Sequence, residues 1–323
     1  MRVNFNIMIK RKYYSWRKSL FIWPTFKKIY SMKSIFLCIF LVVNFLIANG
    51  QKQKINKPLQ LQIEELIKGF NGDIGVYVKS LRTNKIVSIN ADTIFPTASM
   101  VKIPILIGVM DKINKGELQY HQTLTYKDSL LYAGVDILGS FKNNEQIELS
   151  KVIMLMLTMS DNTASLWLQS LAGGGKRINE ILDSLGFKNT RINSRTPGRE
   201  TNRTLYGWGQ TTPFEMAGLF EKIYKREVIS DSASQKMIRL MGRDYWDEQA
   251  ISQIPSWIFV AAKSGAVDES RSETLLVMAS KKPYIFSICT KNNKDKSWKE
   301  SNEAWVLTRK ISKLLWEYFG KKK

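Results

Sequence analysis

The residues best suited to chemistry begin with a serine and a lysine one helical turn apart, in Ser99-Met100-Val101-Lys102. Residues i and i+3 share one face of a helix, so the Ser99 hydroxyl and the Lys102 amine are predicted to be neighbours. A desolvated lysine with a lowered pKa can act as the base that activates a serine. The free N–H groups of a helix start favour an oxyanion at the same place. By itself the motif is more often an N-capping serine beside a solvated lysine. It indicates catalysis only together with further motifs.

A second hydroxyl occurs in Ser160-Asp161-Asn162, between two predicted helices. The Ser160 hydroxyl can relay a proton to a leaving nitrogen, and the Asn162 amide can hold both Lys102 and a substrate amide. Asp161 is expected to be structural, with its carboxylate fixing the amides of a loop. Read alone, this motif is typical of a polar helix N-cap.

The third motif, Lys263-Ser264-Gly265, ends a predicted strand at 257–263. It offers a cation, a hydroxyl and a close approach of the backbone, which suit an extended amide-like ligand that bears a carboxylate. The three motifs in the order SxxK, SDN and KSG are far more specific together than any one alone.

With these motifs the chain resembles the class A β-lactamase and penicillin-binding serine hydrolase family over essentially all of the segment after residue 50. The further matches are Thr158-Met159 before the second motif, Thr163-Ala164 after it, Gly173-Gly174-Gly175, Thr211-Thr212-Pro213, Met216-Ala217 and Ser270-Arg271. The resemblance implies an enzyme in which Ser99 is acylated and Lys102 is its base or proton relay. It also implies that Ser160 passes a proton to the β-lactam nitrogen.

The same resemblance implies the substrate contacts. Asn162 would bind the acylamide side chain of a β-lactam, and the backbone N–H groups of Ser99 and Ala266 would form the oxyanion hole. The substrate carboxylate would be held by Lys263, Ser264 and Arg271. The family works without a metal or an organic cofactor, so none is expected here.

The chain departs from the family in the loop that normally carries the base for deacylation. Aligning Thr190-Arg191 and Pro197 with the family places Thr196 where a glutamate is expected. Glu200 is the carboxylate that a rearranged loop can aim at the ester, and it is also typical of a surface residue paired with a neighbouring arginine. Two alternatives to a β-lactamase therefore stay open. One is a D,D-peptidase or esterase, and the other is a slowly turning over sensor that binds penicillin or peptidoglycan.

Composition excludes several other classes of protein. The 323 residues include 49 Lys or Arg, 28 Asp or Glu and a single histidine, His121, giving a net charge of +21. A metal site built from two or more imidazoles is therefore impossible. The basic residues are spread along the chain with no basic helix, so nucleic acid is not an expected partner. The expected partner is a small-molecule β-lactam or a peptidoglycan-derived substrate, and a monomer is expected.

The first fifty residues are predicted to direct export. Residues 34–48 form an apolar run of 15, which is short for a membrane span and typical of a signal peptide. Met32 is the natural start of such a signal, and cleavage is predicted before Gln51. The protein is thus expected to be periplasmic or secreted, and to meet the membrane only through residues 1–50. Removal of these residues takes away nine basic side chains and lowers the net charge from +21 to +12.

The remaining segment, residues 51–323, is predicted to be one α+β domain with a β-lactamase-like fold. Strand patterns at 74–78, 86–89, 257–263, 274–279 and 284–290 predict a five-stranded antiparallel sheet flanked by terminal helices. Helical patterns between about 96 and 225 predict an inserted helical lobe. The α/β lobe would comprise about 51–95 and 226–323, with the site between the lobes.

Overall fold

The computed structural model describes residues 53–320. The predicted signal peptide and its Met32 start lie outside the described residues, as do residues 321–323. No helix within residues 53–320 is long and apolar enough to cross a membrane.

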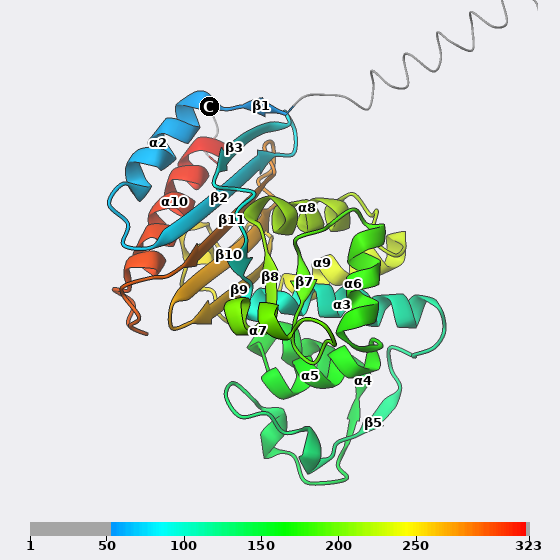
Figure 1. The fold of residues 1–323 in the computed structure, drawn as a ribbon. Coiled ribbons are helices and arrows are strands. Elements are labelled where there is room, and N and C mark those ends of the chain that lie inside the picture. The colour runs from blue at the N-terminus through cyan, green and yellow to red at the C-terminus, as the bar shows by residue number, and fades with distance from the viewer. Residues whose placement is uncertain (1–52, 321–323) are drawn as a thin grey trace, which may run out of the picture. The chain divides into compact units, whose positions relative to one another are not determined.

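The central element is a sheet with strand order β1-β3-β2-β11-β10-β9 (Figure 1). Its strands are β1 (Lys54–Ile55), β2 (Asp73–Ser80), β3 (Lys85–Ile89), β9 (Val260–Val267), β10 (Ser270–Val277) and β11 (Tyr284–Lys291). The five predicted strands are present and pair antiparallel. The sheet differs from the prediction by a sixth strand, β1, which pairs parallel to β3. Two residues are too few to show an alternating pattern, so β1 could not be predicted.

Two terminal helices cover one face of the sheet. Alternate residues of β2 point to opposite faces, and Ile74, Val76 and Val78 pack in one core with α2 (Lys57–Ile67) and α10 (Glu303–Phe319). Tyr77 points to the other face and joins the core of the helical lobe. Because both faces are covered, nearly every residue of β2 is buried.

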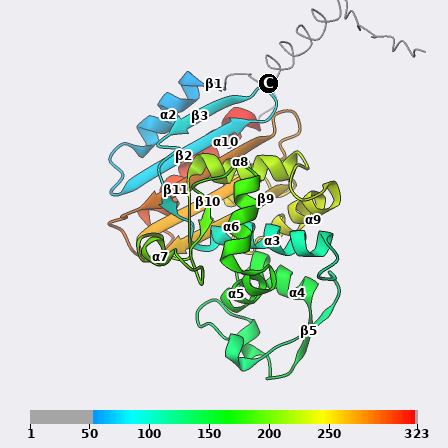
Figure 2. The ribbon, with the colours of Figure 1, turned by 45° about the vertical axis from the view of Figure 1, so that its right-hand side comes forward.

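The helical lobe is built around α3 (Lys102–Asn114; Figure 2), whose residues are buried from Lys102 to Asp111. The other helical segments of the lobe are η1 (Ala98–Val101), α4 (Leu149–Met154), the π-helical η4 (Leu155–Met159), α5 (Asn162–Leu171), α6 (Gly174–Ser184), α7 (Glu200–Tyr206), α8 (Pro213–Tyr224) and α9 (Asp231–Met241), with short 3₁₀ turns η2 (Asp128–Leu130) and η3 (Leu138–Ser140). The 3₁₀ turn η5 (Ile251–Gln253) instead contacts α10. Because α3 is buried on all sides, the side chain of Lys102 lies in the interior of the lobe.

A small sheet of three strands supports the entry to the site. Its order is β4-β8-β7, from β4 (Phe95–Pro96), β8 (Gly209–Thr211) and β7 (Arg191–Ile192). β4 leads directly into η1, and β7 and β8 bracket the loop at 193–208. A two-stranded sheet, β5 (Thr123–Thr125) with β6 (Gln146–Glu148), lies at the far end of the lobe.

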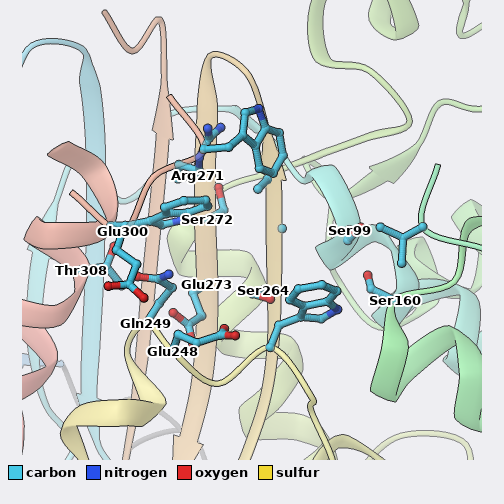
Figure 3. Close-up of a pocket in the computed structure, with 16 residues that line it drawn as sticks. Ser99, Ser160, Glu248, Gln249, Ser264, Arg271, Ser272, Glu273, Glu300 and Thr308 are labelled. Atoms are coloured by element: carbon cyan, nitrogen blue, oxygen red, sulfur yellow. The ribbon is translucent and has the colours of Figure 1, made fainter. Parts of the chain in front are cut away.

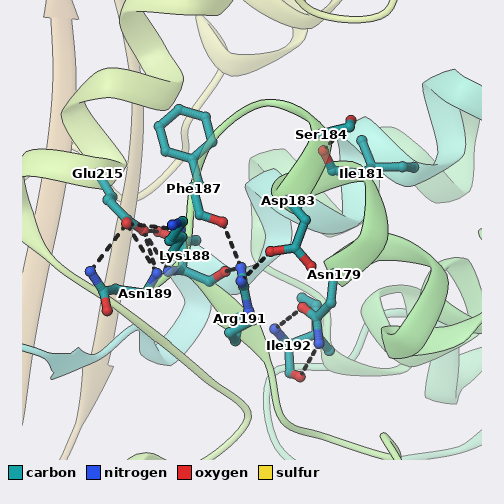
Figure 4. Close-up of polar contacts among 11 residues, drawn as sticks. Asn179, Ile181, Asp183, Ser184, Phe187, Lys188, Asn189, Arg191, Ile192 and Glu215 are labelled. Atoms are coloured by element: carbon teal, nitrogen blue, oxygen red, sulfur yellow. Dashed lines mark hydrogen bonds and ion pairs between the residues drawn. The ribbon is translucent and has the colours of Figure 1, made fainter.

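Glu215 ties the start of α8 to the segment that leads into β7 (Figure 4). Its carboxylate accepts hydrogen bonds from the backbone N–H groups of Lys188, Asn189 and Thr190, at 2.6–3.0 Å. The Thr212 hydroxyl accepts from Glu215 N at 3.1 Å and so caps the start of α8. One end of the loop at 193–208 is therefore fixed by buried, charge-assisted hydrogen bonds.

Candidate active site

Ser99 lies in the 3₁₀ turn η1, immediately before α3. Three residues complete one 3₁₀ turn, so Ser99 and Lys102 lie on the same side, as predicted. Lys102 Nζ is 2.8 Å from Ser99 Oγ. The residue before the nucleophile, Ala98, has φ +43°, a left-handed conformation that is unfavourable for any residue with a Cβ. The chain thus holds the serine at a strained turn, where its side chain is half-buried and lines a cavity.

Lys102 is fully buried and hydrogen-bonded to the second motif as well. Its Nζ lies 2.8 Å from Ser160 O, 3.0 Å from Ser160 Oγ and 3.1 Å from Asn162 Oδ1. Burial, and then the positive charge of Lys263, lower the pKa of the Lys102 amine well below its ordinary value. A neutral amine has a lone pair, so Lys102 can accept the Ser99 hydroxyl proton.

The second motif turns sharply between two helices. Ser160 has φ +61° and ends the π-helical turn η4, while Asp161 caps α5. Asp161 Oδ1 accepts from Ala164 N at 2.7 Å, and Oδ2 accepts from the amides of Ile137 and Leu138 at 2.5 and 3.0 Å. The structural role predicted for Asp161 is confirmed, because its carboxylate joins the loop at 137–138 to the start of α5.

The third motif brings the edge strand β9 against the nucleophile turn. A Cβ on Gly265 would lie 2.5 Å from Thr97 O and 2.8 Å from Ser99 N, so only glycine allows this approach. Ser264 and Ala266 line the cavity together with Ser99. The backbone of Ala266 is therefore beside the nucleophile, where the oxyanion hole is predicted.

Lys263, in contrast, does not reach the cavity surface. Its Nζ is buried, has no hydrogen-bond partner and lies 3.9 Å from Asp244 Oδ2, which is also buried. Burial lowers the pKa of Lys263, and burial raises the pKa of Asp244. Lys263 therefore contributes a positive field from behind β9.

Arg271 lines the same cavity and lies on β10 directly opposite Ala266. Its guanidinium carbon lies 4.5 Å from the ring centre of Trp298 and 4.8 Å from that of Trp305, a double cation–π contact. Its terminal nitrogens donate to the main-chain oxygens of Val267, Ser270 and Ser297. The Arg271 Nε atom is buried without a hydrogen-bond partner, and burial lowers the pKa of the guanidinium. No carboxylate forms an ion pair with Arg271 among residues 53–320, so no neighbouring side chain neutralises its positive charge.

Two adjoining cavities of about 370 and 580 Å³ share Ser99, Ser160 and Ala266 in their walls. Figure 3 shows the first cavity, with Ser99 and Ser160 on one side and Glu248, Glu273 and Glu300 on the side of α10. The second cavity is walled by the loops at 132–135 and 205–208. It holds the Asn162 side chain, as the predicted acylamide contact requires, and aromatic rings of Tyr132, Trp208 and Trp298.

The loop at 193–208 does not bring a carboxylate to Ser99. Glu200 is exposed at the start of α7, its Oε1 accepts from Gly198 N at 3.1 Å, and it lines neither cavity. Thr196 is buried and donates to Ser194 O at 2.9 Å. Asn202 donates to Gln210 at 3.0 Å. The structure thus assembles the predicted site without Glu200.

Sequence reasoning missed two carboxyl groups near the third motif, Asp244 and Glu273. Glu273 pairs with Ser264 across β9 and β10 and is 3% exposed. The available signal was a glutamate next to the apolar run Leu275-Leu276-Val277, because a charged residue inside a buried strand is expected to have a specific partner or role. Nothing in the sequence marked Asp244, because its contact with Lys263 depends on how the loop after α9 folds.

These features define a serine hydrolase in which a buried lysine stands where many such enzymes use histidine. His121, the only histidine, is exposed and lies 2.7 Å from Glu148. Within residues 53–320, no group of three or more His, Cys, Asp or Glu residues is placed to hold a metal ion.

A model of the β-lactamase enzyme family matches residues 58–319, and the chain belongs to this family of class A-like serine enzymes. Beta-lactamase VEB-1 of Pseudomonas aeruginosa is 25% identical over 297 residues, covering 88% of this chain and 97% of the relative. Extended-spectrum beta-lactamase PER-1 of the same organism is 20% identical over 259 residues, covering 77% of this chain and 83% of the relative.

Solved structures confirm the fold. The TLA-1 extended-spectrum beta-lactamase superposes with a TM-score of 0.74 at 20% identity, covering 82% of this chain and 99% of the other. PBP-A superposes with a TM-score of 0.73 at 24% identity, covering 82% and 97%. The predicted β-lactamase-like α+β fold is therefore confirmed.

Proposed function

We propose that this protein opens β-lactam amides through a covalent acyl-Ser99 intermediate. The single observation that carries the proposal is the contact of 2.8 Å between Ser99 Oγ and a buried lysine of lowered pKa. Family membership and the named β-lactamases among the relatives support the substrate class.

Acylation follows from the positions of three side chains. Lys102 takes the Ser99 hydroxyl proton, and Ser99 Oγ forms a bond to the lactam carbonyl carbon. The oxyanion is stabilised by the backbone N–H groups of Ser99 and Ala266. The carbon–nitrogen bond then breaks, and the ring nitrogen receives a proton from Ser160, which Lys102 replenishes across their contact of 3.0 Å.

The substrate carboxylate binds beside Ser264. That hydroxyl lines the cavity, whereas Lys263 supplies charge from behind the strand and Arg271 from the neighbouring strand. The acylamide group then extends toward Asn162 in the second cavity.

Release of the acyl group decides between a β-lactamase and a protein that stays acylated. Among the described residues, no carboxylate hydrogen-bonds to Ser99 or Lys102, and Glu200 faces solvent. This observation favours slow hydrolysis of the ester, as in a penicillin-binding sensor or a D,D-peptidase. Fast hydrolysis of the acyl-enzyme would require the loop at 193–208 to bring the Glu200 carboxylate to the ester, where it would activate the water.

Export to the periplasm or beyond is also a proposal. It is supported by the apolar run at 34–48 and by the basic residues before it. An exported protein would meet β-lactams or peptidoglycan stems outside the cytoplasm, in agreement with the proposed substrate class.

Turnover of a chromogenic cephalosporin by purified residues 51–323 tests the function. The proposal expects ring opening, with at least one burst equivalent of product per enzyme, and none in Ser99→Ala. Ring opening at an equal rate in Ser99→Ala would reject an acyl-Ser99 enzyme. A burst without further turnover would assign the slow, penicillin-binding behaviour.

A further inference from the structure

Glu273 is a buried carboxyl group beside the place where the proposed substrate puts its own carboxylate. It lies directly opposite Ser264 in the register of β9 and β10. Residues opposite each other in an antiparallel pair point to the same face, with Cβ atoms about 5 Å apart. Both residues line the first cavity. A negative charge at Glu273 would therefore oppose an anionic substrate.

The surroundings of Glu273 keep it neutral. Its Oε2 accepts from Ala250 N at 3.0 Å, while Oε1 is buried without a partner. Burial is the main cause that raises the pKa of Glu273 to about 8, and the negative charges of Asp244 and Glu248 add to it. The Ala250 N–H and the Lys263 charge act in the opposite direction. At neutral pH the carboxyl group is therefore mostly protonated.

The charge balance behind Ser264 depends on this proton. Lys263 and Arg271 contribute two positive charges near the strand pair, and buried Asp244 contributes one negative charge. Glu248 and Glu300, which also line the cavity, are exposed, so solvent screens their charges. With Glu273 neutral the cluster is positive, and with Glu273 ionised its positive and negative charges balance. Ile288 of β11, the residue opposite on the other side, and Thr308 of α10 add no charge.

We propose that Glu273 is a specificity-determining residue that admits a substrate carboxylate at Ser264 in its protonated form and disfavours it when ionised. The inference rests on the proposed function, because it concerns the anion of the same substrate. It adds a pH dependence to that contact: lactams with a free carboxylate beside the ring nitrogen should acylate Ser99 fastest below pH 8.

A matched pair of substrates tests this inference, namely one cephalosporin as its free acid and as its uncharged ester. The measurement is the second-order rate constant for acylation of Ser99 from pH 6.5 to 9.5, read by intact-mass spectrometry. In the wild-type protein, the ratio of the acid rate to the ester rate should fall at least about tenfold across this range, because a like charge then faces the carboxylate.

Glu273→Gln keeps the side-chain shape and the acceptor for Ala250 N but cannot ionise. Its ratio should stay constant from pH 6.5 to 9.5 and should equal the wild-type ratio at pH 6.5 within about twofold. Glu300→Gln removes an exposed carboxylate from the same cavity and should retain the wild-type pH profile.

An unchanged alkaline fall in Glu273→Gln would overturn the inference and assign the titration to Lys263. A wild-type ratio that does not change with pH would also overturn it, without the need for any variant. Acylation of Ser99 by both substrates at a constant ratio rejects this inference alone. Absence of acylation by either substrate rejects the proposed function, and this inference with it.

Discussion

Lys102 Nζ lies 2.8 Å from Ser99 Oγ and 3.0 Å from Ser160 Oγ, so one buried amine contacts both hydroxyl groups of the site. This relationship places the base between the nucleophile and the group that protonates the leaving nitrogen. It needs a helix buried on all sides, because a solvated lysine would remain charged at neutral pH.

The role of Lys102 as a base predicts how its substitutions behave. Lys102→Ala should slow acylation of Ser99 by about 10²- to 10⁴-fold, the range for loss of a general base. Lys102→Arg carries a positive charge that a guanidinium does not lose in a protein, so it should be as slow as Lys102→Ala. Fluorescent-penicillin labelling rates would measure both. A fast Lys102→Arg protein would mean that charge, not basicity, is what the site needs.

Gly265 predicts a steric requirement at the junction of β9 and η1. In Gly265→Ala the new Cβ would lie 2.5 Å from Thr97 O, a backbone atom that cannot turn aside. We expect a loss of about 1–3 kcal/mol in the free energy of unfolding and a large loss of acylation. Gly218→Ala in α8 is the control, since its Cβ would meet only the Phe187 ring at 3.2 Å. Urea unfolding would measure the stability, and full labelling of Gly265→Ala would contradict the packing argument.

Burial of Glu273 predicts a dependence of stability on pH. Its pKa in the folded protein is raised to about 8, above that of the unfolded chain, so the folded state holds an extra proton between the two values. The stabilisation is complete below the unfolded pKa and is lost as pH rises through about 8. The melting temperature should therefore fall from pH 6 to pH 9 in the wild type by more than it falls in Glu273→Gln. Equal falls in the two proteins would show that Glu273 is ionised when folded.

The position of Glu200 predicts that its charge does not govern deacylation. Glu200→Gln should leave the lifetime of the acyl-enzyme unchanged within about twofold. The Glu200 carboxylate is exposed and lines neither cavity, so it does not hold a water against the ester. Intact-mass spectra taken over time after a short exposure to penicillin would give the lifetime. An adduct that persists only in Glu200→Gln would show that the loop at 193–208 brings Glu200 to the ester.

Local sequence predicted the parts of the site that depend on short spacing. The separation of Ser99 and Lys102 requires one helical turn, and the cap at Asp161 requires one helix start. The pairing of Glu273 with Ser264 depends instead on strand register, and the contact of Lys263 with Asp244 depends on a loop. Neither of these two contacts can be predicted from residues that are close in sequence.

Arg271 was identified from the sequence, but its surroundings could not be predicted, because they also depend on residues far along the chain. Arg271 was predicted as a substrate contact, but its cation–π contacts with Trp298 and Trp305 were not. Those rings come from the segment before α10 and from α10 itself, more than twenty residues along the chain. The register of β10 with β9 places Arg271 opposite Ala266, and only the packing of the segment before α10 and of α10 itself shows what covers it.

The most direct test of the account is the mass of the protein after exposure to benzylpenicillin. We predict that residues 51–323 gain the mass of one intact penicillin, that peptide mapping places it on Ser99, and that Ser99→Ala gains none while keeping the wild-type melting temperature within a few degrees. An adduct of the same yield in Ser99→Ala, or a wild type that neither gains mass nor opens the lactam, would contradict the assignment of Ser99 as the nucleophile.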